Sequence, residues 1–298
     1  MMEMNILLAL PLGLGSTVSA HIASRGDVDV PFHYVKQGGH LIMVKAKVNG
    51  QGPFDFIVDT GNGSPYGIMV SPSIVKRLDI STQEITTDSG FPIGLSKTFS
   101  VGKIESFELG EISAGNQDVV GADALAELAE RIGAPIDGNL GYGFFKDYTL
   151  TFDFERSTLR LSRDRVKGRA TPIQIGKGKP LIRIAVKANG TTLHFVLDTG
   201  ASRTCISPAA AKELGLDLGE ELRVNKSNDH IAHMSKLTTL TVAGKTQRDV
   251  GIVVAGFVTD LEQAIGTRVD GVLGHNFWSK YRLTIDYPGK RLLLEDGQ

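Results

Sequence analysis

Residues 54–61 read FDFIVDTG and residues 193–200 read LHFVLDTG. In both stretches an apolar run leads into the tripeptide Asp-Thr-Gly, which places Asp59 and Asp198 at equivalent positions. The second motif follows the first by 139 residues, close to half of the 298 residues in the chain. Two acidic residues in matching surroundings, one in each half, indicate a site that is assembled where the halves meet.

The similarity between the halves extends well beyond these tripeptides. Upstream of the motifs, residues 41–50 (LIMVKAKVNG) and 181–190 (LIRIAVKANG) both read as a strand that ends in Asn-Gly, a strong signal for a β-hairpin. Downstream, residues 137–145 (DGNLGYGFF) match residues 270–278 (DGVLGHNFW). Self-similarity at half-chain spacing predicts two homologous lobes rather than a solenoid.

Most of the remaining pattern is typical of strands. Alternating apolar segments are frequent, and 35 glycines fit many tight turns. Ser-Pro at residues 71–72 and again at 207–208 each opens a short helical run, because serine can cap a helix and proline tolerates its first position. The longest helical pattern covers residues 122–132, and its shorter counterpart covers residues 259–265. The sequence therefore predicts an all-β dominated chain with a few short helices.

These residues resemble a known family, the retropepsin-like aspartic proteases, in a tandem two-lobe, single-chain form. The resemblance covers roughly residues 32–294. It rests on two apolar-apolar-Asp-Thr-Gly motifs and two late Leu-Gly pairs, at residues 57–61, 196–200, 140–141 and 273–274. It implies two homologous acid-protease β-barrel lobes that are related by a pseudo-two-fold axis.

The resemblance implies an aspartic endopeptidase in which Asp59 and Asp198 are the catalytic residues. Two carboxyls about a hydrogen bond apart cannot both ionise at modest cost, so the pair shares one proton over a wide pH range. The ionised carboxylate takes a proton from a water, and the protonated carboxyl polarises the scissile carbonyl. This chemistry needs no cofactor and no metal, and the expected partner is a peptide or protein substrate.

The neighbours of each aspartate have expected supporting roles. Gly61 and Gly200 let the backbone turn tightly and bring amides close to the carboxylate. The resemblance implies that the hydroxyls of Thr60 and Thr199 reach across to the opposite lobe and lock the two loops together, a contact that pseudo-symmetry makes reciprocal. It also implies that the two Leu-Gly elements thread behind the catalytic loops and hold them rigid.

The two copies differ, and the differences leave a second interpretation open. Copy one continues with Asn62 after its glycine where copy two has Ala201, and Asn139 stands where an apolar residue is expected before the first Leu-Gly pair. Neither motif has Ser or Thr directly after its glycine. This removes a hydroxyl donor that would favour the charged carboxylate, and we therefore expect activity at mild rather than strong acidity. The alternative is a catalytically weak or inactive peptide-binding protein of the same fold.

Composition excludes several other classes of function. With 41% apolar residues, 22% charged residues and a net charge of −1, the chain has the composition of an ordinary globular protein. Near-neutral charge argues against a nucleic-acid partner. The single cysteine, Cys205, allows no intrachain disulfide and no cysteine-rich zinc site, and we expect it to be a buried apolar residue.

The first 20 residues have much of the pattern of a cleaved signal peptide. Residues 6–14 form an apolar run that is too short to span a bilayer, and residues 18–20 (VSA) fit a small-x-small cleavage site. The segment before the run carries no Lys or Arg, which departs from the usual pattern. We expect a secreted or periplasmic protein without a stable membrane span, or a cytoplasmic one if this segment is not a signal.

We expect lobe one at residues 31–161, a charged linker at residues 162–169 and lobe two at residues 170–298. Because both acidic residues come from one chain, the protein is expected to act as a monomer. Residues 88–100 and 225–236 are candidate flap hairpins that would cover the site, and the alternative for each is an ordinary solvent-exposed hairpin.

Overall fold

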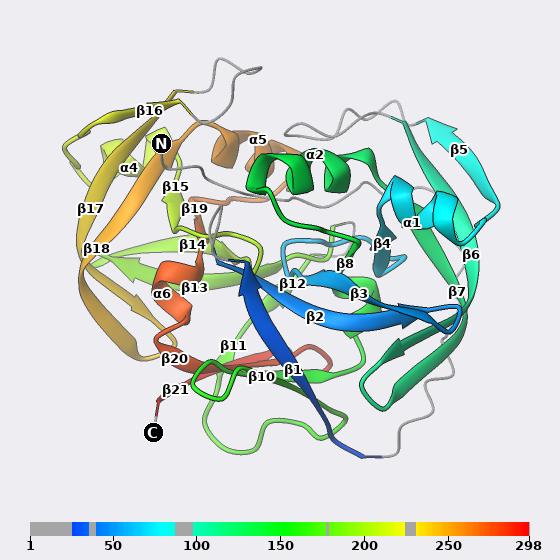
Figure 1. Cartoon of the computed structure of the whole chain (residues 1–298). Coiled ribbons are helices and arrows are strands. Elements are labelled where there is room, and N and C mark those ends of the chain that lie inside the picture. The colour runs from blue at the N-terminus through cyan, green and yellow to red at the C-terminus, as the bar shows by residue number, and fades with distance from the viewer. Residues whose placement is uncertain (1–25, 36–39, 87–97, 177–178, 224–230, 298) are drawn as a thin grey trace.

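The computed structural model describes residues 26–35, 40–86, 98–176, 179–223 and 231–297 (Figure 1). In this part of the chain strands dominate, and the six helices are short, with four to ten residues each. None of these helices is long and apolar enough to cross a membrane. The prediction of an all-β dominated chain with a few short helices is confirmed.

Six strands of the first half form a closed barrel, here called lobe one. β2 pairs with β3 at one side and with β6 at the other, where Ala46 lies opposite Leu109, so the ring has no free edge at this point. β5 (Thr82–Thr86) extends the sheet beyond β6. Around the barrel the order is β2 (Leu41–Val48), β3 (Gln51–Val58), β8 (Gly138–Leu140), β4 (Ile68–Val70), β7 (Ile112–Gly121) and β6 (Thr98–Leu109).

The second half repeats this arrangement strand for strand as lobe two. β17 pairs back with β13, where Val186 lies opposite Val242. Two short strands, β12 (Gln174–Ile175) and β16 (Glu221–Arg223), lie at the ends of the sheet. Around the barrel the order is β13 (Ile182–Ala188), β14 (Thr191–Leu197), β19 (Gly271–Leu273), β15 (Cys205–Ile206), β18 (Lys245–Ala255) and β17 (Ile231–Val242). Two homologous lobes are therefore present (Figure 1).

The two Asn-Gly turns explain how each barrel begins and how it closes. Asn49 and Gly50 have φ of 50° and 70°, and Asn189 and Gly190 have φ of 47° and 88°, as a two-residue turn that follows the twist of its strands requires. Asn49 Oδ1 also accepts hydrogen bonds from two backbone amides of β6 (2.8 and 3.2 Å). Asn189 Oδ1 accepts one from a backbone amide of β17 (3.1 Å). In each lobe the same asparagine thus forms the turn with its backbone and binds, through its side chain, the strand that closes the barrel.

A third sheet joins the lobes. β9 of the first half pairs antiparallel with β20 of the second half, with Phe152 opposite Leu283. β1 (Val28–Val35) pairs with β10 through its first residues and with β2 through its last, so it links this sheet to the barrel of lobe one. The order is β11 (Thr171–Pro172), β21 (Arg291–Asp296), β20 (Tyr281–Asp286), β9 (Thr149–Asp153), β10 (Thr158–Ser162) and β1.

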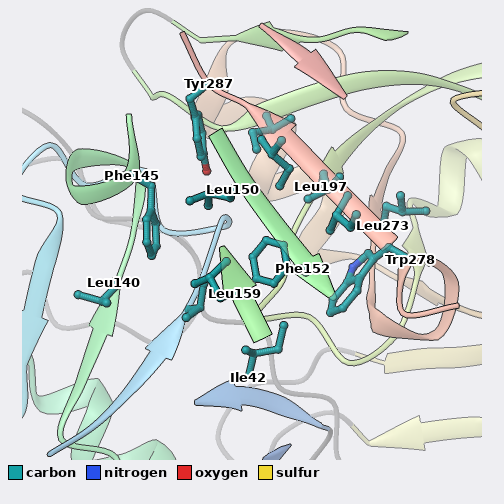
Figure 2. Close-up of a cluster of buried hydrophobic side chains, with 14 of the residues drawn as sticks. Ile42, Leu140, Phe145, Leu150, Phe152, Leu159, Leu197, Leu273, Trp278 and Tyr287 are labelled. Carbon is teal, nitrogen blue, oxygen red and sulfur yellow. The ribbon is translucent and has the colours of Figure 1, made fainter. Parts of the chain in front are cut away.

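Apolar side chains of both lobes pack together around this shared sheet (Figure 2). Leu140 of lobe one and Leu197 and Leu273 of lobe two belong to the same buried cluster as Leu150 and Phe152 of β9. All five are fully buried. Burying one such side chain contributes about 1.5–3 kcal/mol. The lobes therefore share one core, which fixes how they sit relative to each other.

The predicted helices are present within one or two residues of the expected positions. Ser71 Oγ and Ser207 Oγ each accept a backbone N–H three residues ahead and cap α1 (Pro72–Arg77) and α4 (Pro208–Glu213). The longer helical patterns form α2 (Asp123–Ile132) and α5 (Phe257–Ile265). Two four-residue helices directly follow the Leu-Gly pairs, α3 (Tyr142–Phe145) and α6 (His275–Trp278).

Several expectations fall outside the described residues. These include the segment at residues 1–20 and the tips of both candidate flap hairpins, within residues 87–97 and 224–230. The arms of those hairpins belong to the paired strands β5 and β6 and the paired strands β16 and β17. The first residue of the expected linker, Ser162, is still part of β10.

Candidate active site

Asp59 and Asp198 directly follow the last residues of β3 and β14. Each of these strands pairs in parallel with the short strand of a Leu-Gly element, β3 with β8 and β14 with β19. The backbone N–H of Asp59 donates to the carbonyl of Leu140 (2.9 Å), and that of Asp198 donates to the carbonyl of Leu273 (3.2 Å). The late Leu-Gly elements therefore hold the backbone from which the two acidic side chains extend.

The two acidic side chains lie beside each other, and both are fully buried. A Cβ atom on Gly200 would lie 2.9 Å from Asp59 Oδ1 and 3.2 Å from Asp198 Oδ1, so both carboxylates approach this one point. A Cβ atom on Gly61 would lie 2.5 Å from Asp198 Cγ. Glycine is needed at both positions because a side chain there would take the space of a carboxylate. The structure thus brings together the four residues Asp59, Gly61, Asp198 and Gly200.

Thr60 and Thr199 connect the two loops through reciprocal hydrogen bonds. Thr60 Oγ1 donates to the carbonyl of Leu197 (2.9 Å), and Thr199 Oγ1 donates to the carbonyl of Val58 (2.8 Å). Each hydroxyl also accepts the backbone N–H of the opposite threonine at 3.0 Å. These four bonds are buried and cross from one lobe to the other, which is the geometry that the resemblance implied.

The surroundings of the two carboxylates are not equivalent. The amide of Gly61 donates to Asp59 Oδ1 (2.8 Å), and the amide of Gly200 donates to Asp198 Oδ1 (2.7 Å). Asp59 Oδ2 accepts a further hydrogen bond from Asn139 Nδ2 (2.8 Å). Asp198 Oδ2 is buried and has no hydrogen-bond partner among the residues that the structure describes. The backbone frame is symmetric, whereas the side-chain donors favour Asp59.

This asymmetry is reflected in the pKa values of the pair. Burial raises the pKa of Asp59 to about 6, against the hydrogen bonds from Asn139 and from backbone amides, which lower it. Burial, together with the neighbouring charge of Asp59, raises the pKa of Asp198 well above its ordinary range. Two carboxyls this close share one proton over a range of pH, because the charge of one opposes the ionisation of the other.

Asn62 and Asn139 are site residues that sequence reasoning missed. The sequence showed them as departures from the repeat, but both are buried, and Asn62 Nδ2 donates to Asn139 Oδ1 (2.7 Å). Each of them replaces a residue that is apolar in the other copy, and both lie in the same lobe. These two facts are the sequence signal that the two side chains interact. Two amides at buried positions of one lobe need partners, and the simplest partner is the other amide.

Two further polar groups lie close enough to the acidic pair to interact with it. Tyr287 and Cys205 are buried, and burial raises the pKa of each. The charges of Asp59 and Asp198 raise the pKa of Tyr287 further, and the charge of Asp198 raises that of Cys205. Cys205 was expected to be a buried apolar residue, and its side chain is fully buried. Within the described ranges, no three His, Cys, Asp or Glu side chains are grouped as metal ligands would be.

A family model described as aspartyl protease matches the chain twice, at residues 44–144 and 184–277. The first match contains Asp59 and Asn139, and the second contains Asp198. No match was found among curated proteins. The two matches together cover more than half of the chain, one on each lobe. The chain therefore belongs to the aspartyl protease family, with the retropepsin-like unit of that family present twice in tandem.

Proposed function

We propose that this protein is an aspartic endopeptidase that hydrolyses peptide bonds with a water activated by Asp59 and Asp198. The observation that carries the proposal is the pair of fully buried carboxylates that approach one point, with pKa values that allow one shared proton. Membership of the aspartyl protease family supports a protease-type function.

The proposed reaction follows from a pair with one proton. The ionised carboxylate removes a proton from the water as its oxygen forms a bond to the carbonyl carbon of the substrate. The protonated carboxyl gives its proton to the carbonyl oxygen, and a tetrahedral diol results. A proton then passes from the pair to the amide nitrogen and the C–N bond breaks. As it breaks, one hydroxyl of the diol returns its proton to the pair, which leaves a carboxylic acid, an amine and a pair that again holds one proton.

The surrounding structure supports this chemistry by holding the pair in place. The cross-lobe hydrogen bonds of Thr60 and Thr199 and the backbone contacts of the Leu-Gly elements leave little freedom at the two carboxylates. Rigid placement within a fraction of an ångström is worth several kcal/mol of the barrier, on the order of 7 or more in favourable cases. Because both carboxylates come from one chain, we propose that a monomer suffices.

The proposal predicts that each acidic residue is essential. Asp59→Asn and Asp198→Asn should each lower kcat/KM on casein or a peptide pool by about 10³-fold or more, because neither variant can hold one proton and one charge. Asp249→Asn is the matched control, since that side chain is 71% exposed on β18, and it should retain wild-type activity. Thermal unfolding must show that all three variants are folded. Full activity in either site variant would rule out the proposal.

A peptide-binding protein without catalysis is the second candidate. Asn62 and Asn139, the two departures from the repeat, are the observation that favours it. Wild-type protein that cleaves no substrate between pH 3 and pH 7, yet binds peptides in a titration, would establish this alternative. Cleavage that is lost in Asp59→Asn would exclude it.

A further inference from the structure

A directed chain of hydrogen bonds ends on Asp59. The backbone N–H of Ser64 donates to Asn62 Oδ1 (3.0 Å). The amide nitrogen of Asn62 donates to Asn139 Oδ1 (2.7 Å), and the amide nitrogen of Asn139 donates to Asp59 Oδ2 (2.8 Å). A backbone N–H can donate and cannot accept, so it fixes which end of the Asn62 amide faces Asn139. The orientation of Asn139 follows, and its donor end must face Asp59.

The chain of amides is built tightly into lobe one. Asn62 is 1% exposed and Asn139 is fully buried. The carbonyl of Asn62 accepts the backbone N–H of Tyr142 (2.8 Å). A Cβ atom on Gly141 would lie 2.5 Å from Asn62 Cγ, so the glycine of the Leu-Gly pair leaves room for this side chain. Asn62 and Asn139 are therefore held in one arrangement by their surroundings.

Lobe two has no equivalent of this chain. Ala201 occupies the position of Asn62, and Val272 occupies the position of Asn139, and both are buried. Neither side chain can donate a hydrogen bond. Asp198 Oδ2 correspondingly has no partner within the described part of the chain. The two acidic residues thus receive the same backbone donor and differ in the side-chain donor.

We infer that Asn139, oriented by Asn62, decides which carboxyl holds the shared proton, and so makes Asp59 the base and Asp198 the acid of the reaction. Each carboxylate oxygen of Asp59 accepts a hydrogen bond from an N–H group. An N–H group cannot accept a hydrogen bond from a protonated carboxyl, so this environment favours the ionised form of Asp59. A proton on Asp59 Oδ2 would face the N–H of Asn139, whereas Asp198 Oδ2 faces no donor. This inference rests on the proposed endopeptidase function.

The assignment sets the direction of proton movement in the first step. Asp59 removes the proton from the water as the new C–O bond forms, and Asp198 gives its proton to the carbonyl oxygen. The other titratable groups near the pair do not compete for this role. Burial raises the pKa of Tyr287 and of Cys205, so both stay neutral in the acidic and neutral range where the pair titrates. Asn139 acts through Asp59 and is a positioning residue.

Replacement of the amide by a side chain of the same shape tests the inference. Asn139→Leu removes the donor and keeps the branched outline. The acidic limb of the pH profile of kcat/KM should move up by about one unit, which lowers kcat/KM about tenfold on the acidic side and little at the optimum. Asn62→Leu should move the limb in the same direction by less, because Asn139 keeps its amide and loses its orientation.

Asn276→Leu is the matched control. Asn276 also bridges two segments through a part-buried amide, which accepts from the N–H of Thr204 (2.7 Å) and donates to the carbonyl of Gly251 (2.8 Å). Its loss should lower the melting temperature and leave the acidic limb in place. An acidic limb that Asn139→Leu does not move, with kcat/KM lowered equally at every pH, would show a merely structural role and overturn the inference.

A second measurement does not depend on activity. The carboxyl groups of the two aspartates can be titrated by carbon-13 NMR, with the signals assigned from Asp59→Asn and Asp198→Asn. In the wild type, Asp59 should titrate with the lower of the two apparent pKa values. Asn139→Leu should raise that pKa. A lower pKa on Asp198, or no change in Asn139→Leu, contradicts the inference even if the enzyme is active. If the wild-type protein cleaves no peptide, the proposed function is contradicted. The NMR titration then still tests which carboxyl holds the shared proton.

Discussion

At the residue scale, the acidic pair combines a symmetric backbone with asymmetric side chains. Gly61 and Gly200 each donate an amide to the aspartate two positions earlier, and each leaves space that the opposite carboxylate occupies. Asn139 then adds a donor on one side only. The pair therefore has the geometry of a dyad and a built-in difference between its two members.

The glycine of the first motif gives a prediction at this scale. Gly61→Ala would place a Cβ atom 2.5 Å from Asp198 Cγ, so either the carboxylate or the loop must move. We expect kcat/KM to fall at least 100-fold, since small displacements at a catalytic group have effects of this size, roughly 10²-fold per ångström. Gly251→Ala is the control, because nothing lies within 4 Å of its added Cβ atom. Equal activity in the two variants would contradict the close approach.

The aspartates, threonines and glycines could be predicted from the sequence because each occurs twice in matching surroundings. The role of Asn62 and Asn139 could not. They are 77 residues apart, and each appears in only one copy, so the repeat that identified the other residues marks them as departures. Their meaning depends on a contact between two buried amides, which only the folded arrangement brings together.

At the element scale, the two Asp-Thr-Gly loops are joined by short contacts between lobes rather than by long elements. The hydroxyls of Thr60 and Thr199 make all four cross-lobe hydrogen bonds of these loops given above. The Asn-Gly hairpins and the Ser-Pro helix starts could be predicted, because local turn and cap residues specify them. The pairings β2–β6, β13–β17 and β9–β20 join strands far apart in sequence, which local patterns do not determine.

Removal of one threonine hydroxyl should weaken the contact between lobes. Thr60→Val keeps the side-chain shape but leaves the carbonyl of Leu197 and the N–H of Thr199 buried without their partner. Each of the two unsatisfied buried groups costs about 1–3 kcal/mol, so the free energy of unfolding in urea should fall by about 2–6 kcal/mol. Thr241→Val is the control, since its hydroxyl bond to Thr246 (2.8 Å) is exposed, and it should change stability by less than about 0.5 kcal/mol. An equal loss of unfolding free energy in the two variants would argue against a stabilising role of the hydrogen bonds between the lobes.

At the scale of the whole molecule, two closed barrels share one six-stranded sheet and one core. The acidic pair directly follows the ends of β3 and β14. Side chains of both lobes contribute to that core (Figure 2). This arrangement lets one chain supply both carboxylates, but it buries two acidic groups, which opposes folding whenever they are ionised.

The burial of the pair predicts a pH dependence of stability. Burial raises the pKa of Asp59 to about 6 in the folded chain and also raises that of Asp198 well above its ordinary range, whereas both are ordinary in the unfolded chain. The stabilising contribution is therefore fully present below about pH 4 and is lost as the pH rises through about 6. Between pH 4 and pH 7 the wild type should lose about 3 kcal/mol or more relative to Asp59→Asn/Asp198→Asn, measured by urea unfolding. Parallel stability curves would show that the carboxylates are not buried.

We propose that one chain holds both carboxylates of a single catalytic pair. The most direct test is the rate of peptide cleavage by wild type, by Asp59→Asn and Asp198→Asn alone, and by an equimolar mixture of the two variants. We expect wild-type activity that is proportional to protein concentration, and no activity in either variant or in their mixture. Activity in a single variant, or activity restored in the mixture, would contradict the claim.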